Sequence, residues 1–312
     1  MVGAAADSKD ARAGGWPMLL IGSGLRPHNH GDLHLTWRYR TFASSGVNAG
    51  HSSRDDWAAT PMMNEFKRLT GIVNRDALYV WRRISRPATI RLDRMVVPMN
   101  VMAMTADARH GFWLGEYERE ERSLLAATLQ PDDVVLELGT GLGVISTLAA
   151  LILGSGKNVH SYEANPKLEA DIRRVYEANG VKPNFHPFPL GLSECDITFY
   201  VSPNFFSSTT VDHGQSAEKV TVRQQPISDV LTHLRPSYLI MDIEGGEVDL
   251  VPAMDLSSID RILIEVHPHK AGPAPVSAMI ASILGRGFCL DTRRSSRDVL
   301  FFFRAETRHA TA

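Results

Sequence analysis

The feature that most constrains the fold is an apolar strand pattern that runs directly into three alternating glycines. Val134–Leu138 has the composition of a short buried strand, Gly139, Gly141 and Gly143 follow it, and the apolar run Val144–Leu153 comes next. Glycine tolerates positive φ and places no side chain between the backbone and a ligand, so it suits a chain that turns from a strand straight into a helix. The sequence therefore predicts a strand, a ligand-binding loop and a helix in succession.

The spacing of these glycines favours a ligand without a pyrophosphate. A dinucleotide-binding fingerprint has its third glycine at a position that Val144 occupies in this chain. Glu137 stands inside the motif, where a phosphate-free ligand tolerates a negative charge better than a pyrophosphate does. The helix expected from about Gly143 offers its free N–H groups to a carboxylate of the ligand.

A second acidic residue is placed to bind a ribose. Glu163 ends the next apolar strand, about twenty residues beyond the glycine loop, which is the spacing of an acid that accepts both ribose hydroxyls. We expect its side chain to be partly exposed in the crevice. Together with the loop, it predicts a nucleoside ligand.

Two later strands also end in functional side chains. The strands expected at 237–243 and 261–267 carry Asp242 and Glu244 at the end of the first and His267 at the end of the second. In a doubly wound parallel sheet, ligands bind beyond the carboxyl ends of the strands. We therefore expect these three side chains to face the same crevice as the glycine loop.

Four motifs carry a resemblance to a known family. They are Glu-Leu-Gly-Thr-Gly-Leu-Gly at 137–143, Tyr-Glu-Ala-Asn-Pro at 162–166, Asp-Ile-Glu-Gly-Gly-Glu at 242–247 and Ile-Glu-Val-His-Pro at 264–268. In this order, from about residue 115 to 303, the chain resembles the FkbM family of S-adenosylmethionine-dependent methyltransferases. The acidic motif at 242–247 is the specific part, because the glycine loop is shared by nearly all class I methyltransferases. The family more often has Asp where this chain has Glu137.

The resemblance implies a fold, a cofactor and a set of site residues. The fold is α/β, with the Rossmann-like, doubly wound, mostly parallel seven-stranded sheet of class I methyltransferases and an antiparallel C-terminal hairpin. The cofactor is S-adenosylmethionine. The expected cofactor-binding residues are Glu137, Gly139, Thr140, Gly141, Gly143, Glu163, Ala164, Asn165, Gly191 and Asp242.

An alcohol that accepts a methyl group also has to lose a proton, and we assign that chemistry to His267, Asp242 and Glu244. His267 is the candidate general base, because a neutral imidazole works near pH 7. Three roles are open for Asp242 and Glu244: holding the acceptor hydroxyl, raising the basicity of His267, or binding a divalent ion together with Glu247. No metal site is predicted on this basis.

Alternation of short apolar runs with periodic stretches predicts the remaining elements. Strands are expected at 134–138, 159–163, 184–190, 237–243 and 261–267. Helices are expected at 143–153, 166–179, 227–234, 246–253 and 275–286. An antiparallel insertion is expected at 196–201 and 218–224, and a final pair of strands near 288–291 and 298–303. This order predicts a parallel sheet with helices on both faces.

The chain divides into an N-terminal extension and one catalytic domain. We interpret the segments as a disordered tail at 1–15, a cover at 16–110, the methyltransferase domain at 111–305 and a tail at 306–312. The cover has amphipathic helical patterns within 61–85 and a strand or hairpin at 88–97. A helix is expected to begin at Gly115 and to run to about Leu129. The family resemblance places its Tyr117-Glu118 segment just ahead of the first core strand, where it would cover the cofactor.

Composition limits the partners. With 33 basic and 35 acidic residues, the net charge of −2 argues against general nucleic-acid binding. The most apolar run, Val144–Gly154, is about half of the ~20 residues that a membrane span needs, so no membrane segment is predicted. Cys195 and Cys289 form no disulfide framework, which indicates a reducing, cytoplasmic setting. None of these features indicates an oligomeric state.

The favoured activity is methyl transfer to a hydroxyl of a sugar, a polyketide or another small metabolite, with the acceptor held by the N-terminal cover and by loops such as 202–216. One alternative is an NAD(P)-dependent oxidoreductase, and Val144 together with the lack of a Tyr-x-x-x-Lys pair argues against it. The other is a catalytically inactive cofactor-binding scaffold, and the intact acids at 242–247 argue against that.

Overall fold

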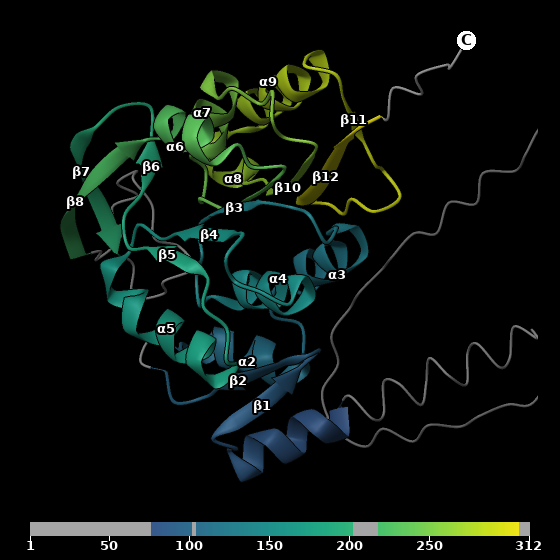
Figure 1. Cartoon of the computed structure of the whole chain (residues 1–312). Helices are drawn as coiled ribbons and strands as arrows, with labels where there is room; N and C mark the ends of the chain where they lie inside the picture. Colours follow the sequence, from purple (N-terminus) through teal and green to yellow (C-terminus); the bar gives the residue numbers. More distant parts are fainter. Residues whose placement is uncertain (1–75, 102–103, 202–217, 306–312) are drawn as a thin grey trace, which may run out of the picture. The chain divides into compact units, whose positions relative to one another are not determined.

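The computed structural model describes residues 76–101, 104–201 and 218–305 (Figure 1). The predictions for the tail at 1–15, for most of the cover up to residue 75, for the loop at 202–216 and for the tail at 306–312 lie outside the described residues.

A seven-stranded sheet forms the centre of the fold, with the order β11-β12-β10-β9-β3-β4-β5. Its strands are β3 (Val135–Leu138), β4 (Val159–Tyr162), β5 (Asn184–His186), β9 (Tyr238–Met241), β10 (Arg261–Glu265), β11 (Phe288–Leu290) and β12 (Val299–Arg304). The strands β10, β9, β3, β4 and β5 run parallel, whereas β12 pairs antiparallel with both β10 and β11. The predicted fold class, including the antiparallel edge pair, is confirmed.

The strand order reverses direction next to β3. From β3 the chain moves to β4 and β5 on one side, and then returns to β9 and β10 on the other. In open α/β sheets, a ligand binds in the crevice at such a switch point, outside the carboxyl ends of the strands. The topology therefore places the crevice where β3 and β9 end.

Helices cover both faces of the sheet because successive strand residues point in opposite directions (Figure 1). Val135, Ile240 and Leu263 pack with α3 (Arg119–Thr128) and α4 (Val144–Leu153) on one face. Leu136, Leu239 and Ile262 lie in a second core on the other face, and the elements there are α6 (Ile227–Leu234), α7 (Glu247–Ala253) and α9 (Pro273–Gly285). Every residue of β3 and β9 is buried, as expected for central parallel strands.

The described part of the N-terminal extension shares the first of these cores. A helix at 76–85 precedes the hairpin of β1 (Thr89–Leu92) and β2 (Met95–Pro98), which was expected as a strand or hairpin at 88–97. Met95 and Val97 are fully buried in the same cluster as Val135 and Ile145. The extension therefore contributes to the core that supports the glycine loop.

Some element boundaries differ from the sequence prediction. The helix α2 (Ala106–Leu114) was not expected; Thr105 caps its start by accepting a hydrogen bond from the N–H of Ala108, and Gly115 ends it with a φ of 76°. The strand expected at 184–190 divides into β5 and β6 (Leu190–Gly191), and the helix expected at 166–179 into η1 (Pro166–Leu168) and α5 (Glu169–Ala178).

The expected antiparallel insertion is present as β7 (Cys195–Val201) and β8 (Glu218–Pro226), and β6 joins β8 in parallel to form a three-stranded sheet. The last short helix, α8 (Pro268–Ala271), begins directly after His267. No helix among the described residues is long and apolar enough to cross a membrane.

Candidate active site

A cavity of about 390 Å³ lies at the carboxyl ends of β3, β4 and β9. Gly139 and Gly141 form its wall after β3, Glu163 lies after β4, and Asp242 lies after β9. Gly191 and the side chains of Ile197 and Phe199 extend the wall on the side of the insertion, so the cavity combines polar groups with an apolar surface. We refer to it as the cofactor cavity.

The glycine loop depends on its glycines for two separate reasons. Gly139, Gly141 and Gly143 have φ values of 85°, 55° and 77°, in the left-handed region that favours glycine. In addition, a Cβ at Gly139 would overlap the backbone carbonyl of Asp242, because the ends of β3 and β9 approach each other closely there. The loop is therefore fixed by the packing of the sheet as well as by its own turn.

Glu163 holds the loop after β3 from the end of β4. Its Oε2 accepts a hydrogen bond from the N–H of Gly141 at 3.0 Å, and its Oε1 accepts one from the N–H of Asn165 at 2.8 Å. Burial raises the pKa of this carboxyl to about 7, although the backbone hydrogen bonds act in the opposite direction. The expectation of a partly exposed side chain was wrong: Glu163 is only 7% exposed, because both of its oxygens point toward backbone amides.

Six of the ten residues expected to bind the cofactor line this cavity, and they are Gly139, Gly141, Glu163, Ala164, Gly191 and Asp242. The other four, Glu137, Thr140, Gly143 and Asn165, are not part of its lining. The Thr140 hydroxyl donates to the carbonyl of Tyr162 at 3.2 Å, and the Asn165 side chain accepts from the N–H of Lys167 at 3.1 Å. These two side chains shape the loops behind the wall.

Glu137 lies beneath the glycine loop. It is 1% exposed and lies close to the polar groups of Thr140 and Ser146. Burial raises the pKa of its carboxyl to about 8, and these polar neighbours oppose the shift. The acid within the motif therefore supports the start of α4 from inside the protein.

A second, more open hollow of about 1130 Å³ lies on the other side of Asp242. The start of α3 and residues 294–299 form its walls, together with Glu265. Tyr117, Glu118, Asp242 and Glu244 line both this hollow and the cofactor cavity. We call the second one the outer hollow, and these four residues form the boundary between the two.

Two of the boundary residues, Tyr117 and Glu118, were expected only to cover the cofactor and not to belong to the site. The Tyr117 ring stacks on Phe112 at 4.1 Å, and its hydroxyl hydrogen-bonds to Glu118. Glu118 has a φ of 46°, which is unusual outside glycine, and burial raises the pKa of its carboxyl well above the ordinary value. The Tyr-Glu pair ahead of the first core strand was the available sequence signal.

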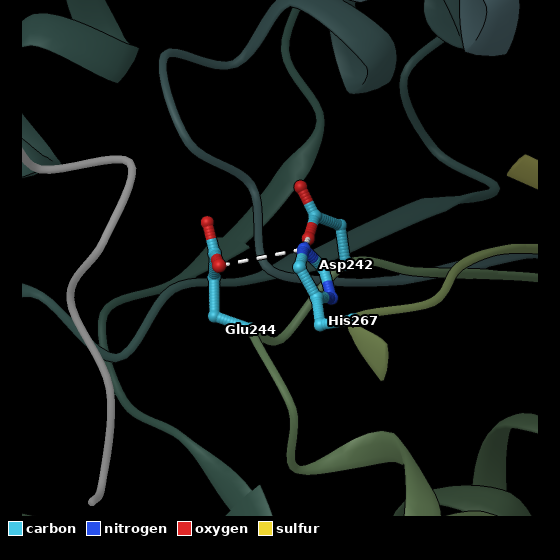
Figure 2. A group of neighbouring side chains, drawn as sticks. All are labelled: Asp242, Glu244 and His267. Atoms are coloured by element: carbon cyan, nitrogen blue, oxygen red, sulfur yellow. Dashed lines mark ion pairs between the residues drawn. The ribbon is translucent and has the colours of Figure 1, made fainter. Parts of the chain in front are cut away.

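Asp242, Glu244 and His267 come together at the ends of β9 and β10, as the sequence predicted (Figure 2). His267 Nε2 lies 3.3 Å from Glu244 Oε2 and 3.5 Å from Asp242 Oδ1. On its other side, Nδ1 lies 3.1 Å from Oε1 of the buried Glu247. Lys270 forms an ion pair with Glu244 at the edge of this group.

Glu247 is held in place by the loop that carries Asp242 and Glu244. Its two carboxylate oxygens accept hydrogen bonds from the N–H groups of Ile243, at 3.1 Å, and Gly245, at 2.9 Å. The acidic motif thus forms a closed turn around one of its own carboxylates. That carboxylate fixes the orientation of the His267 ring.

The surroundings of His267 bear on its predicted role as a neutral general base. Burial lowers the pKa of the imidazole, but the hydrogen bond to Glu247 and the charges of Glu244, Glu247 and Glu265 outweigh it and raise the pKa overall. The side chain is also 6% exposed and lines neither the cofactor cavity nor the outer hollow. His267 lies behind Asp242 and Glu244 and supports them.

The strand order and the crevice at the switch point are those of the class I methyltransferase fold. The sequence model of the methyltransferase FkbM domain matches residues 134–290, half of this 312-residue chain. The chain therefore belongs to the FkbM methyltransferase family.

Individual relatives are more distant. Ribosomal protein L11 methyltransferase from Thermus thermophilus is 31% identical over 120 residues, which are 36% of this chain and 46% of that protein. The chain thus matches less than half the length of this relative. Among solved structures, precorrin-6y C5,15-methyltransferase from Geobacter metallireducens is 11% identical with a TM-score of 0.38, covering 68% of this chain and 94% of that one. A methyltransferase from Pyrococcus furiosus is also 11% identical, with a TM-score of 0.35, covering 61% and 84%.

Proposed function

We propose that this methyltransferase uses S-adenosylmethionine to methylate a hydroxyl oxygen of a small molecule, such as a sugar, a polyketide or another small metabolite. One observation carries the proposal: the cofactor cavity and the outer hollow meet at a boundary formed by Tyr117, Glu118, Asp242 and Glu244. A methyl transfer needs two ligands whose reacting atoms meet in line. Two hollows with a common acidic wall provide that arrangement.

The cofactor cavity suits an adenosine ligand in size and in chemistry. Its volume of about 390 Å³ falls within the range of small-molecule sites, roughly 300–1,000 Å³. Glu163 is assigned to the ribose, because each carboxylate oxygen that accepts a backbone N–H can still accept a hydroxyl. Gly139 and Gly141 let the backbone approach the cofactor without a side chain between them.

Asp242 and Glu244 are assigned to the acceptor. A carboxylate oxygen that accepts a hydrogen bond from the acceptor hydroxyl orients the oxygen lone pair and increases its electron density. The new O–CH3 bond forms as the bond from the methyl carbon to sulfur breaks, S-adenosylhomocysteine leaves with the sulfur electron pair, and the hydroxyl proton passes to the carboxylate of Asp242 or Glu244. His267 completes the catalytic group by fixing the positions of both carboxylates.

The direct test is methyl transfer from labelled S-adenosylmethionine into fractionated metabolites of the source organism, followed by mass spectrometry of the labelled product. We expect the label on an oxygen of a small molecule. A product labelled on nitrogen or carbon would contradict the choice of oxygen, and label in no product together with tight cofactor binding would favour the scaffold alternative.

A separate measurement tests the ligand class. Isothermal titration calorimetry should show binding of S-adenosylhomocysteine and no comparable binding of NADH. Tight binding of NADH alone would instead support the oxidoreductase alternative.

A further inference from the structure

We propose that Asp242, Glu244 and His267 bind a divalent transition-metal ion, such as Mn²⁺, at the boundary between the cofactor cavity and the outer hollow. The binding itself is independent of the proposed function. Only the catalytic role of the ion rests on the proposed methyl transfer.

The first argument is the spacing of the ligand atoms. One carboxylate oxygen of Asp242, one of Glu244 and one imidazole nitrogen of His267 all lie within 4.8 Å of one another (Figure 2). The two distances from Nε2 to these oxygens, 3.3 and 3.5 Å, are close to the ~3 Å between neighbouring ligands of an octahedral ion with bonds of ~2.1 Å. Small side-chain movements would bring all three atoms to one ion.

The second argument is the orientation of the imidazole. A histidine that binds a metal generally donates its other ring N–H to a carboxylate, which fixes the ring and its tautomer. Glu247 occupies that position beside Nδ1 of His267, and two backbone N–H groups hold it there. This arrangement directs Nε2 toward Asp242 and Glu244.

The third argument is the concentration of negative charge where the three groups meet. Asp242 Oδ1 is buried and has no hydrogen-bond partner among the described residues. His267 is more than nine-tenths buried, and the groups nearest its Nε2 are carboxylate oxygens of Asp242, Glu244 and Glu265. Around a neutral imidazole, these three carboxylates carry more negative charge than the ammonium of Lys270 balances. A cation bound by Nε2 and the carboxylates of Asp242 and Glu244 would balance more of it.

Lys270 is the competing cation. Its ammonium group pairs with Oε2 of Glu244, the same oxygen that faces His267 Nε2. A metal ion must share this carboxylate with Lys270 or displace it. This competition makes Lys270 a useful site for a test, because its removal should strengthen metal binding.

The mixture of ligands indicates which ion binds. Two carboxylates and one imidazole suit Mn²⁺ or a later first-row ion better than Mg²⁺ or Ca²⁺, which prefer oxygen ligands alone. Since Asp242 and Glu244 line both spaces, the ion's open positions would face the acceptor. Such an ion, held by Asp242, Glu244 and His267, would supply Lewis acidity that lowers the pKa of an acceptor hydroxyl bound beside it.

Electron paramagnetic resonance of Mn²⁺ provides a readout that does not depend on activity. The full-length protein is stripped with a chelator, dialysed and titrated with Mn²⁺, and the decrease in the free-ion signal gives the stoichiometry and affinity. We expect one ion per chain. Asp242→Asn and His267→Gln should each weaken binding by at least roughly tenfold, since ~1.4 kcal/mol corresponds to one decade in affinity.

A matched control removes the same charge nearby without removing a proposed ligand. Asp249→Asn, on the wall of the cofactor cavity, should leave Mn²⁺ affinity within about twofold of the parent. Lys270→Met should tighten Mn²⁺ binding by removing the competing ammonium. If His267→Gln fails to fold, Asp242→Asn and Lys270→Met still decide the question.

Two results would overturn the proposal: no Mn²⁺ binding by the parent protein and by Lys270→Met, or equal weakening by Asp242→Asn and Asp249→Asn. Failure of metal binding together with normal binding of S-adenosylhomocysteine would leave the proposed function intact. Loss of cofactor binding in the parent protein would instead count against the proposed function.

Discussion

Replacing Glu163 with alanine tests the assignment of the cofactor cavity most directly. The carboxylate accepts hydrogen bonds from the N–H groups of Gly141 and Asn165 and, in the proposed complex, from both ribose hydroxyls. Hydrogen bonds to a charged group are worth about 1.5–3 kcal/mol each when one partner is removed. The loss of even one such bond corresponds to roughly a tenfold decrease in affinity. We therefore expect Glu163→Ala to weaken S-adenosylhomocysteine binding by ten- to several-hundredfold, and Glu163→Gln to be intermediate because one acceptor oxygen remains.

The effect on stability should be much smaller than the effect on binding. The pKa of Glu163 is about 7 in the fold against an ordinary value of 4.5, so above pH 7 the ionised carboxylate costs the fold about 3 kcal/mol even with its hydrogen bonds counted. Truncation removes this cost and leaves two backbone N–H groups without an acceptor, at roughly 1–3 kcal/mol each. The two effects largely offset each other, so the variant should fold.

Calorimetry with S-adenosylhomocysteine measures the binding, and thermal unfolding of the same samples measures the stability. Glu169→Ala is the matched control, because this carboxylate lies only six residues further on, pairs with Arg173 and does not line the cavity. If Glu163→Ala binds S-adenosylhomocysteine as tightly as the parent and the control do, then the ribose does not bind at the end of β4. The assignment of an adenosine cofactor would lose its main support.

Three further predictions follow from the buried groups around the loop. Glu137 has a pKa of about 8 in the fold against 4.5 ordinarily, so between these pH values the folded state holds a proton that the unfolded state has lost, and the free energy of unfolding falls as pH rises. In urea denaturation, the free energy of unfolding of the parent should decrease between pH 5 and pH 8.5 by a few kcal/mol more than that of Glu137→Gln. Equal decreases would contradict a buried, protonated carboxyl. Gly139→Ala should abolish cofactor binding or lower the melting temperature by several degrees, because the alanine Cβ would overlap the Asp242 carbonyl. A variant unchanged in both measurements would show that the ends of β3 and β9 are further apart. His267→Ala should lower the turnover of labelled methyl groups at least tenfold and change the affinity for S-adenosylhomocysteine less than about twofold, because the His267 side chain does not line the cofactor cavity. An equal loss of turnover and of affinity would exclude a role confined to catalysis.

The sequence by itself determined the local units of the fold and their order. Spacing of glycines, apolar runs and strand-ending acids are local signals, and they placed the glycine loop, Glu163 and the acidic motif at the correct ends of β3, β4 and β9. The least accurate local predictions were at element boundaries. The helix α2 was missed because its ends are set by Thr105 and Gly115 rather than by an amphipathic pattern.

Only the tertiary structure decided how these residues work together. The sequence separates Tyr117 from Asp242 by more than a hundred residues, yet both lie on the boundary between the cofactor cavity and the outer hollow. Burial raises the pKa of Glu163, and four carboxylates from the loop after β9, from α7 and from β10 surround His267. Protonation, exposure and cavity shape depend on neighbours that are brought together by packing, and the spacing of residues along one chain does not contain that information.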